Sequence, residues 1–206
     1  LELSQIHSTT ARFETVDLNA VLQIVTSELE EEIKASGAVI RYDAMPTING
    51  IESQVFYLFK NLVSNGIKFQ LKDNKPEVII SFQNVSEIVK EEQRIPGNYL
   101  KISVKDNGIG FEQEFAEKIF TTFTRLNSKD QYEGTGLGLS LCKRIAERHG
   151  GSVRAESAGE GHGATFIVEL PLHQSLMAEG GRRNEEVEEV EAPVKHEPAA
   201  VRRLQS

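Results

Sequence analysis

The 206-residue chain has no tryptophan, one cysteine and only 7% aromatic residues. A single cysteine excludes a disulfide within the chain and fits a reducing compartment. Because Cys142 falls in the apolar run 139–145, we expect a buried core residue rather than a reactive thiol. No stretch approaches the roughly 20 apolar residues of a membrane-spanning helix, and the N-terminus lacks the pattern of a signal peptide. We therefore expect a cytoplasmic fragment, whose parent protein could have membrane segments.

Basic residues are also in short supply, since the formal net charge is -8. A nucleic-acid-binding protein usually has a basic surface, so this balance argues against that class of function. The contents of 39% hydrophobic and 26% charged residues are ordinary for a soluble globular domain. The length is sufficient for one domain with a hydrophobic core, with or without tails.

Hydrophobic periodicity predicts an alternation of helices and strands. The predicted strands are 13–16, 38–42, 78–82, 100–104, 153–157 and 164–170. The predicted helices run from Leu18 to Gly37, over 51–69 and over 137–149, with a short helix near 113–120. A charged loop is expected at 89–98. This order predicts an α/β fold, a two-layer sandwich in which helices cover one face of a mixed β-sheet.

The composition changes after His173, where the chain becomes rich in Glu, Arg, Pro and Ala. Such a segment buries too little apolar surface to offset its ordering entropy, so we expect a disordered tail or linker over 174–206. A partner-binding segment is the alternative, because valines recur within it. The predicted domain therefore covers 13–173, and residues 1–12 hold the end of a helix and a linker.

The predicted helix over 51–69 carries Asn61, Asn65 and Lys68 along one stripe, at spacings of four and three residues. A carboxamide oxygen is a suitable ligand for Mg²⁺, and a nearby ammonium group neutralises phosphate. Spacing alone also fits a solvated polar face. Asparagine is a poor helix former, however, so two of them within one helix require a reason.

Two glycine-bearing motifs follow predicted strands or open predicted helices. Asp106-Asn107-Gly108-Ile109-Gly110 follows a strand, so its carboxylate can accept a hydrogen bond from an exocyclic amine where the glycines let the backbone approach a ligand. By itself the motif also fits a structural turn. Residues 134–139, Gly-Thr-Gly-Leu-Gly-Leu, open a helix whose N-terminal amides suit phosphate. A helix cap is the alternative there, and neither the Rossmann nor the P-loop pattern matches.

The order of these motifs resembles the N, G1, F and G2 boxes of histidine kinases. The F-box resemblance lies at 119–126, Ile-Phe-Thr-Thr-Phe-Thr-Arg-Leu, and the turn at 159–166 resembles the closing hairpin of the same family. Histidine kinases share the GHKL superfamily with DNA gyrase, the large heat-shock chaperone and mismatch-repair ATPases. The resemblance covers roughly residues 13–172 and implies the GHKL (Bergerat) ATP-binding fold, with residues 1–12 as the end of a dimerisation helix.

The resemblance implies a nucleotide site. Asp106 would bind the adenine amino group, with Thr165 helping through water, and Asn65 would hold Mg²⁺ with Asn61 beside it. The phosphate contacts would come from Lys68 and Arg125, and the walls of the base pocket from Phe69 and Ile109. The other implied nucleotide-binding residues are Gly108, Gly110, Phe123, Gly134, Thr135, Gly136, Leu137 and Gly138. A mobile lid would lie between Leu126 and Glu133.

Asn61 separates two subfamilies, because gyrase-like members carry a glutamate there as general base for water. An amide cannot take a proton, so the resemblance implies phosphoryl transfer to a histidine rather than hydrolysis. None of the five histidines has the sequence setting of the acceptor, and His149 is expected to end a helix as a cation. The implied partners are a dimerisation and phosphoacceptor domain and a response-regulator receiver domain. The fragment itself is expected to be a monomer. A non-catalytic nucleotide-binding scaffold and a GHKL ATPase are the alternatives.

Overall fold

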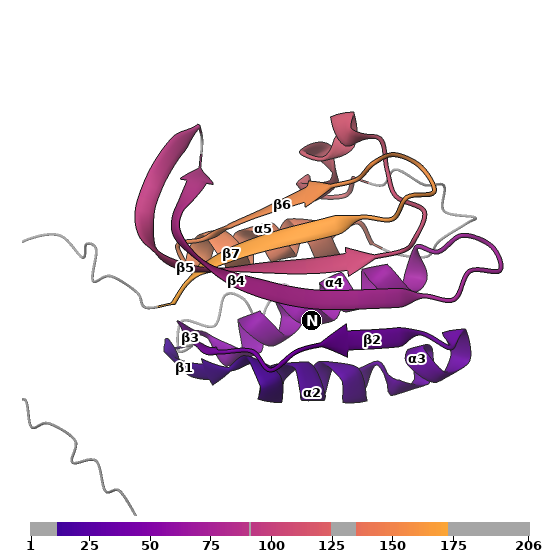
Figure 1. Ribbon diagram of the computed structural model, residues 1–206, viewed down its shortest axis with the longest axis horizontal. Helices are drawn as coiled ribbons and strands as arrows, with labels where there is room; N and C mark the ends of the chain where they lie inside the picture. Colours follow the sequence, from indigo (N-terminus) through magenta and orange to yellow (C-terminus); the bar gives the residue numbers. More distant parts are fainter. Residues whose placement is uncertain (1–11, 91, 125–134, 173–206) are drawn as a thin grey trace, which may run out of the picture. The chain divides into compact units, whose positions relative to one another are not determined.

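The central element is a five-stranded mixed sheet with the strand order β2-β4-β5-β7-β6. The computed structural model describes residues 12–90, 92–124 and 135–172. The strands of this sheet are β2 (Val39–Tyr42), β4 (Glu77–Lys90), β5 (Gln93–Asp106), β6 (Ser152–Glu156) and β7 (Thr165–Pro171). β2 runs parallel to β4, whereas the other neighbouring strands are antiparallel (Figure 1).

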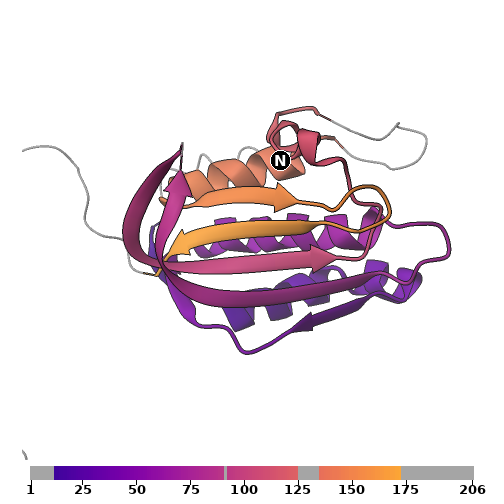
Figure 2. The same ribbon diagram turned by 45° about the horizontal axis from the view of Figure 1, so that its top comes forward.

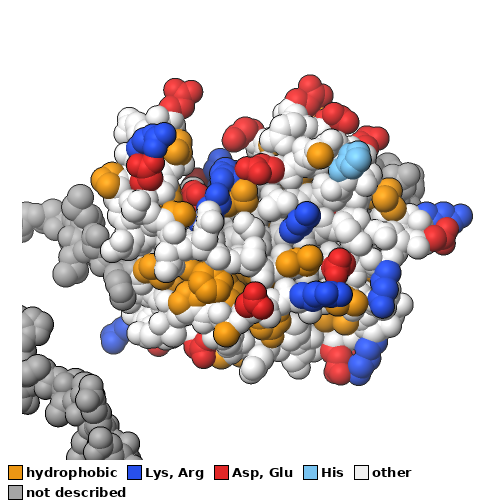
Figure 3. Space-filling model, viewed as in Figure 1, with side chains coloured by type: hydrophobic (Ala, Val, Ile, Leu, Met, Phe, Trp, Pro, Cys, Tyr) orange, Lys and Arg blue, Asp and Glu red, His pale blue; other side chains and the backbone are white. Residues whose placement is uncertain are grey.

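The helices lie on one face of this sheet, as Figure 2 shows. They are α2 (Leu18–Glu28), α3 (Glu30–Ser36), α4 (Glu52–Lys68) and α5 (Gly138–Arg148). No described helix covers the opposite face, on which basic and acidic side chains are interspersed with apolar ones (Figure 3). The predicted two-layer α/β architecture is therefore confirmed.

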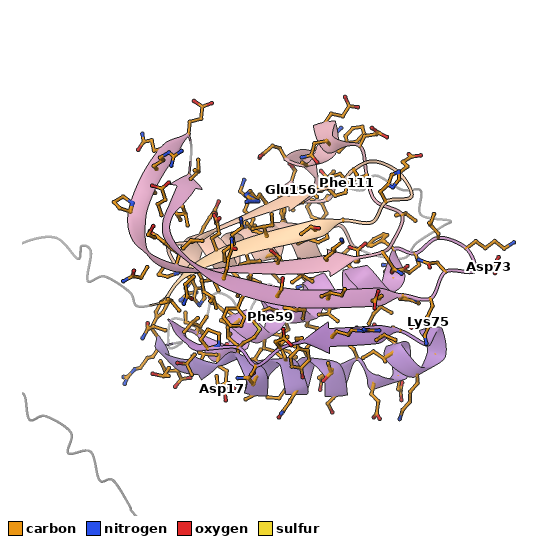
Figure 4. The ribbon with its side chains drawn as sticks, in the orientation of Figure 1. Asp17, Phe59, Asp73, Lys75, Phe111 and Glu156 are labelled. Carbon is orange, nitrogen blue, oxygen red and sulfur yellow. The ribbon has the colours of Figure 1, made fainter. Side chains whose placement is uncertain are left out.

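The core forms where the apolar stripes of the helices meet the inner face of the sheet. α4 buries Val55, Leu58 and Leu62, as the helical spacing of these residues predicts. Phe59 is also fully buried and lies in the interior (Figure 4). Cys142 is fully buried as predicted, and burial raises the pKa of its thiol to about 12. A thiol with such a pKa stays protonated and unreactive at neutral pH.

A smaller, two-stranded sheet contains the first described strand of the domain. β1 (Glu14–Asp17) pairs antiparallel with β3 (Thr47–Gly50), with Glu14 opposite Gly50. β1 matches the predicted strand over 13–16, but β3 was not predicted. Asp17 ends β1 and caps α2, because its side chain accepts a hydrogen bond from the amide of Asn19.

The prediction of a charged loop over 89–98 is wrong. β4 and β5 continue as a hairpin beyond the sheet, with Ile88 opposite Ile95 and Lys90 opposite Gln93. This part curls away from the sheet at the upper left of Figure 1. The charged residues of this part obscure the strand pattern in the sequence. Pro96 is tolerated because β5 pairs with β7 only from Tyr99 onward, so no hydrogen bond to β7 is required from position 96.

Two predicted helices are divided in the structure. The helix expected from Leu18 to Gly37 is interrupted at Leu29, between α2 and α3. The short helix expected near 113–120 consists of two 3₁₀ turns, η1 (Gln113–Phe115) and η2 (Lys118–Phe120). The predicted tail over 174–206, the lid and almost all of the predicted helix end at 1–12 lie outside the described residues.

Candidate functional site

Asp106 is the last residue of β5, the central strand of the sheet, and is buried. Its Oδ1 accepts hydrogen bonds from the amides of Gly108 (2.9 Å) and Ala164 (3.1 Å). Burial raises the pKa of Asp106 to about 6, although these two hydrogen bonds lower it. Within the described part of the chain, both hydrogen bonds end on Oδ1, so Oδ2 is left for a ligand.

The turn after Asp106 is fixed by the side chain of Asn107. Its Oδ1 accepts a hydrogen bond from the amide of Glu77 (2.8 Å), and its Nδ2 donates to the carbonyl of Lys75 (3.0 Å). Asn107 was not singled out from the sequence, although asparagine before glycine is a turn signal. Its contacts hold the turn against the start of β4.

Gly108 is required for close packing of this turn against the end of α4. A Cβ at Gly108 would lie 2.1 Å from the carbonyl oxygen of Phe69. The amide of Ile109 donates to that same carbonyl (2.9 Å). In the structure the glycine lets one segment of the chain approach another, and its expected approach to a ligand stays a prediction.

A second turn, over 157–164, packs against the first. The amide of Gly163 donates to the carbonyl of Gly108 (3.0 Å). Ser157 Oγ accepts from the amide of Phe111 (3.1 Å) and donates to the carbonyl of Gly163 (2.8 Å). At Gly110, φ is +64°, and a Cβ would lie 2.3 Å from the carbonyl of Gly159. Ser157 is thus a further supporting residue that the sequence reasoning missed.

The predicted polar stripe of α4 lies along one side of the site. Asn61, Asn65 and Lys68 are all half-buried, and Lys68 Nζ lies 5.2 Å from the centroid of the Phe69 ring. Asn61 Nδ2 donates to the carbonyl of Tyr57 (2.9 Å), one turn earlier. This stripe is therefore partly enclosed rather than a fully solvated face.

The N-terminus of α5 meets this stripe. A Cβ at Gly138, the first residue of α5, would lie 2.7 Å from Asn61 Oδ1. Among the described residues, no side chain caps this helix end, and its first turn carries no acidic residue. Unpaired amides at a helix N-terminus attract anions. The end of α5 next to Asn61 is thus suited to phosphate.

The remaining predicted residues extend the site on either side. Phe123 is 72% exposed and has φ of +62°, and its amide donates to the carbonyl of Gly136 (3.0 Å). Thr135 and Leu137 precede α5, and Thr165 lies opposite Lys105 in the β5–β7 pair. Arg125 and Gly134 lie outside the described residues.

Gly66 turns out to touch the site. The sequence indicated only a slight loosening of the helix, with no contact to proposed ligands. In the structure, a Cβ at Gly66 would lie 2.7 Å from Val78 Cγ2 and 3.3 Å from the Cβ of Asp106. Glycine thus lets α4 pack closely beneath Asp106.

Gly66→Ala is expected to destabilise the domain despite the better helix propensity of alanine. The new methyl gains up to about 1 kcal/mol of propensity, but it displaces buried Val78 at a cost of about 1–3 kcal/mol. Urea unfolding of Gly66→Ala, Val78→Ala and the double variant measures the coupling. The double variant should be more stable than the sum of the single effects predicts, and strict additivity would contradict this packing.

His149 ends α5 as predicted, but the expectation of a cation there is wrong. It is 1% exposed, and burial lowers the pKa of its imidazole. Nε2 accepts a hydrogen bond from the amide of Ile51 (3.0 Å), and Nδ1 lies 2.8 Å from the carbonyl of Ile145. Because an N–H donates to Nε2, the ring is neutral with its proton on Nδ1.

No group of three or more His, Cys, Asp or Glu side chains suited to a metal ion occurs in the described ranges. Asn65 carries one neutral side-chain oxygen, a type of ligand that Mg²⁺ can take beside phosphate and water oxygens. In the same ranges, no helix has the length and apolar character needed to cross a membrane.

Several known proteins are similar to this chain in sequence. The family model described as histidine kinase-, DNA gyrase B-, and HSP90-like ATPase matches residues 50–174. Cyanobacterial phytochrome A of Nostoc sp. is 34% identical over 185 residues, which are 90% of this chain and 22% of that protein. Sporulation kinase C of Bacillus subtilis is 35% identical over 164 residues, 78% of this chain and 34% of that protein. The chain thus spans only a minor part of these relatives.

Solved structures share the fold. The catalytic domain of histidine kinase ThkA has a TM-score of 0.62 and 24% identity, over 79% of this chain and 99% of that domain. Full-length ShkA in complex with AMPPNP has a TM-score of 0.63 and 23% identity, over 79% of this chain and 32% of that one. The match of the family model over residues 50–174 shows that the chain belongs to the family of histidine kinase-, DNA gyrase B- and HSP90-like ATPases, and its fold is that of the histidine kinase catalytic domains.

Proposed function

We propose that this domain binds ATP with Mg²⁺ and transfers the γ-phosphoryl group to a histidine of a separate helical domain of its parent kinase. The observation that carries the proposal is the junction of Asn61 with Gly138, at the N-terminus of α5, which no described side chain caps. It puts a neutral amide and a phosphate-binding helix end together. A response-regulator receiver domain is the proposed next acceptor, and the cytoplasm the proposed location.

The base of the nucleotide is assigned to the end of β5, beside Asp106. Asp106 Oδ2 accepts a hydrogen bond from the adenine amino group, because Oδ1 is already engaged by two amides. Phe69 and Ile109, which are hydrogen-bonded through their backbones, wall the ring. Thr165 supports the base through water.

The phosphates are assigned to the N-terminal end of α5, beside the polar stripe of α4. Gly136 and Gly138 offer backbone amides, and Lys68 with Arg125 neutralises the charge of the phosphate chain. Asn65 holds Mg²⁺, which screens the phosphate oxygens during transfer. Catalysis then rests on positioning and electrostatic stabilisation.

Asn61 decides between transfer and hydrolysis. Its Nδ2 is engaged by the carbonyl of Tyr57, and its amide has no basic lone pair for a proton from water. A site without a general base for water favours an external nucleophile such as a neutral imidazole. A GHKL-type ATPase is therefore the weaker alternative.

Radiolabelled ATP with Mg²⁺ tests the proposal, with and without a separately purified histidine-phosphoacceptor domain of the parent kinase. We expect label on the acceptor that is stable in base and labile in acid, and phosphate release at least tenfold slower than transfer. Phosphate release at an equal rate without the acceptor would instead indicate an ATPase. Absence of nucleotide binding in calorimetric titration would indicate a scaffold.

A further inference from the structure

His149 joins segments that are far apart in the sequence. It follows α5 directly, and its Nε2 accepts the amide hydrogen of Ile51, 98 residues away in the chain. The ring of Phe13 packs edge-on against the imidazole, with a centroid distance of 5.1 Å. A Cβ at Gly50 would lie 3.2 Å from Nε2, so the surroundings of the ring are tightly packed.

These contacts lie at the opposite end of the helices from the candidate nucleotide site. Ile51 is the N-cap of α4 and has no side-chain cap hydrogen bond within the described residues. α4 has 17 residues, about 25 Å of helix, and carries the polar stripe near its other end. α5 has 11 residues, about 16 Å, and begins beside Asn61. α5 therefore contacts α4 at both of its own ends: Gly138 meets Asn61 near the middle of α4, and His149 meets Ile51 at the start of α4.

A hydrogen bond at one end constrains the alignment at the other, because packed helices move as rigid elements. Sliding α5 along α4 would break the bond between His149 and Ile51 and would also shift Gly138 against Asn61. Loss of the acceptor would leave the buried amide of Ile51 without its partner, which favours such a shift. Phe13 brings the entry of the chain to the same junction through the pairing of Glu14 with Gly50.

We propose that His149 is a positioning residue for the nucleotide site: by accepting the Ile51 amide, it sets the alignment of α5 against α4. It touches no nucleotide and acts through the two helices. The inference deepens the proposed function and rests on it for its effect on catalysis. The alignment itself does not depend on nucleotide.

Two amide substitutions separate this role from general packing. In His149→Gln the side-chain oxygen reaches about the position of Nε2, whereas in His149→Asn it reaches only about that of Nδ1. We expect His149→Gln to bind Mg²⁺-ATP within about threefold of the parent chain. We expect His149→Asn to bind at least tenfold more weakly and to transfer phosphate more slowly at saturating ATP.

A matched control variant lowers the stability of the domain at a position away from the candidate site. Ile88 is 2% exposed and lies in the hairpin, outside the core cluster, so Ile88→Ala lowers stability without reaching the site. Unfolding curves identify a temperature at which all variants are folded. Equal loss of ATP affinity in His149→Asn and Ile88→Ala, or unchanged affinity in His149→Asn, would overturn the proposal.

A nucleotide-free measurement keeps the inference apart from the proposed function. Amide chemical shifts of Leu137, Gly138 and Leu139 should change in His149→Asn and stay near the parent values in His149→Gln and Ile88→Ala. If the parent chain bound no ATP, the proposed function would be wrong. The amide shifts would still test whether His149 sets the alignment of α5 against α4. Unchanged shifts in His149→Asn would overturn the positioning role.

Discussion

Asp106→Asn is expected to abolish ATP binding and, at the same time, to stabilise the nucleotide-free domain above pH 6. The carboxylate is the group proposed to accept the adenine amine, and an amide that turns its NH₂ toward that amine cannot replace it. Its burial opposes ionisation, so the pKa of Asp106 is raised from 3.8 to about 6. The residue proposed to bind nucleotide therefore destabilises the nucleotide-free domain at neutral pH.

The sign of the pH dependence follows from the raised pKa. The folded state holds the Asp106 proton more tightly than the unfolded state, so this stabilisation is complete below pH 3.8 and is lost as the pH rises through about 6. The difference between these values corresponds to about 3 kcal/mol. The lowered pKa of His149 acts in the opposite direction, but it is common to both proteins and cancels in their difference.

Urea unfolding of the parent chain and of Asp106→Asn, between pH 4 and pH 8 without nucleotide, measures this difference. The stability of Asp106→Asn relative to the parent should rise by roughly 1–3 kcal/mol across the range. Calorimetric titration with Mg²⁺-ATP at pH 8 should give heat only for the parent. Equal ATP binding by both proteins would mean that adenine binds elsewhere, and a constant stability difference would mean that Asp106 is not desolvated.

Gly163→Ala is expected to destabilise the domain far more than Gly161→Ala, two residues earlier in the same turn. Both glycines have positive φ, +68° and +80°, so an alanine at either position costs about 1–2 kcal/mol of backbone strain. A Cβ at Gly161 meets nothing within 4 Å, whereas at Gly163 it would lie 2.1 Å from the carbonyl oxygen of Asp106. Backbone must then move, which adds about 1–3 kcal/mol.

The same displacement would reach the nucleotide site, because it shifts the residue that ends β5. We therefore expect Gly163→Ala to lose about 2–5 kcal/mol of stability and to bind ATP at least tenfold more weakly where it is still folded. Gly161→Ala should bind ATP like the parent. Thermal unfolding and titration with ATP of the two variants side by side make the comparison. Similar losses of stability in both would show that the positive φ alone, and not the contact of the new Cβ, causes the loss.

The sequence predicted those parts of the fold whose burial follows a simple period. α4 and α5 were predicted within one or two residues, because their apolar stripes face the core. β3 was missed because its four residues include Asn49 and Gly50, which do not favour strands. The extended part of the β4–β5 hairpin was missed because it pairs only with itself, so no burial pattern marks its two faces.

The candidate site was predictable in its residue types but not in its supporting contacts. Helical spacing places Asn61, Asn65 and Lys68 on one stripe without any tertiary information. The clamps made by Asn107 and Ser157 join segments more than 25 residues apart, which no local pattern reveals. His149 shows the same limit, because a helix-terminal histidine looks like a solvated cation until the fold buries it against Ile51.

The long hairpin also bears on how copies of this chain behave toward one another. Beyond the sheet, neither outer edge of the hairpin pairs with another described strand, so its backbone groups are of the kind that a strand of another copy could pair with. The hairpin carries several features that oppose such pairing: the irregularity between Val85 and Glu87, the ion pair of Glu87 with Arg94, and Pro96, which has no amide hydrogen to donate. Self-association through β-sheet extension is therefore discouraged where the chain is most open to it.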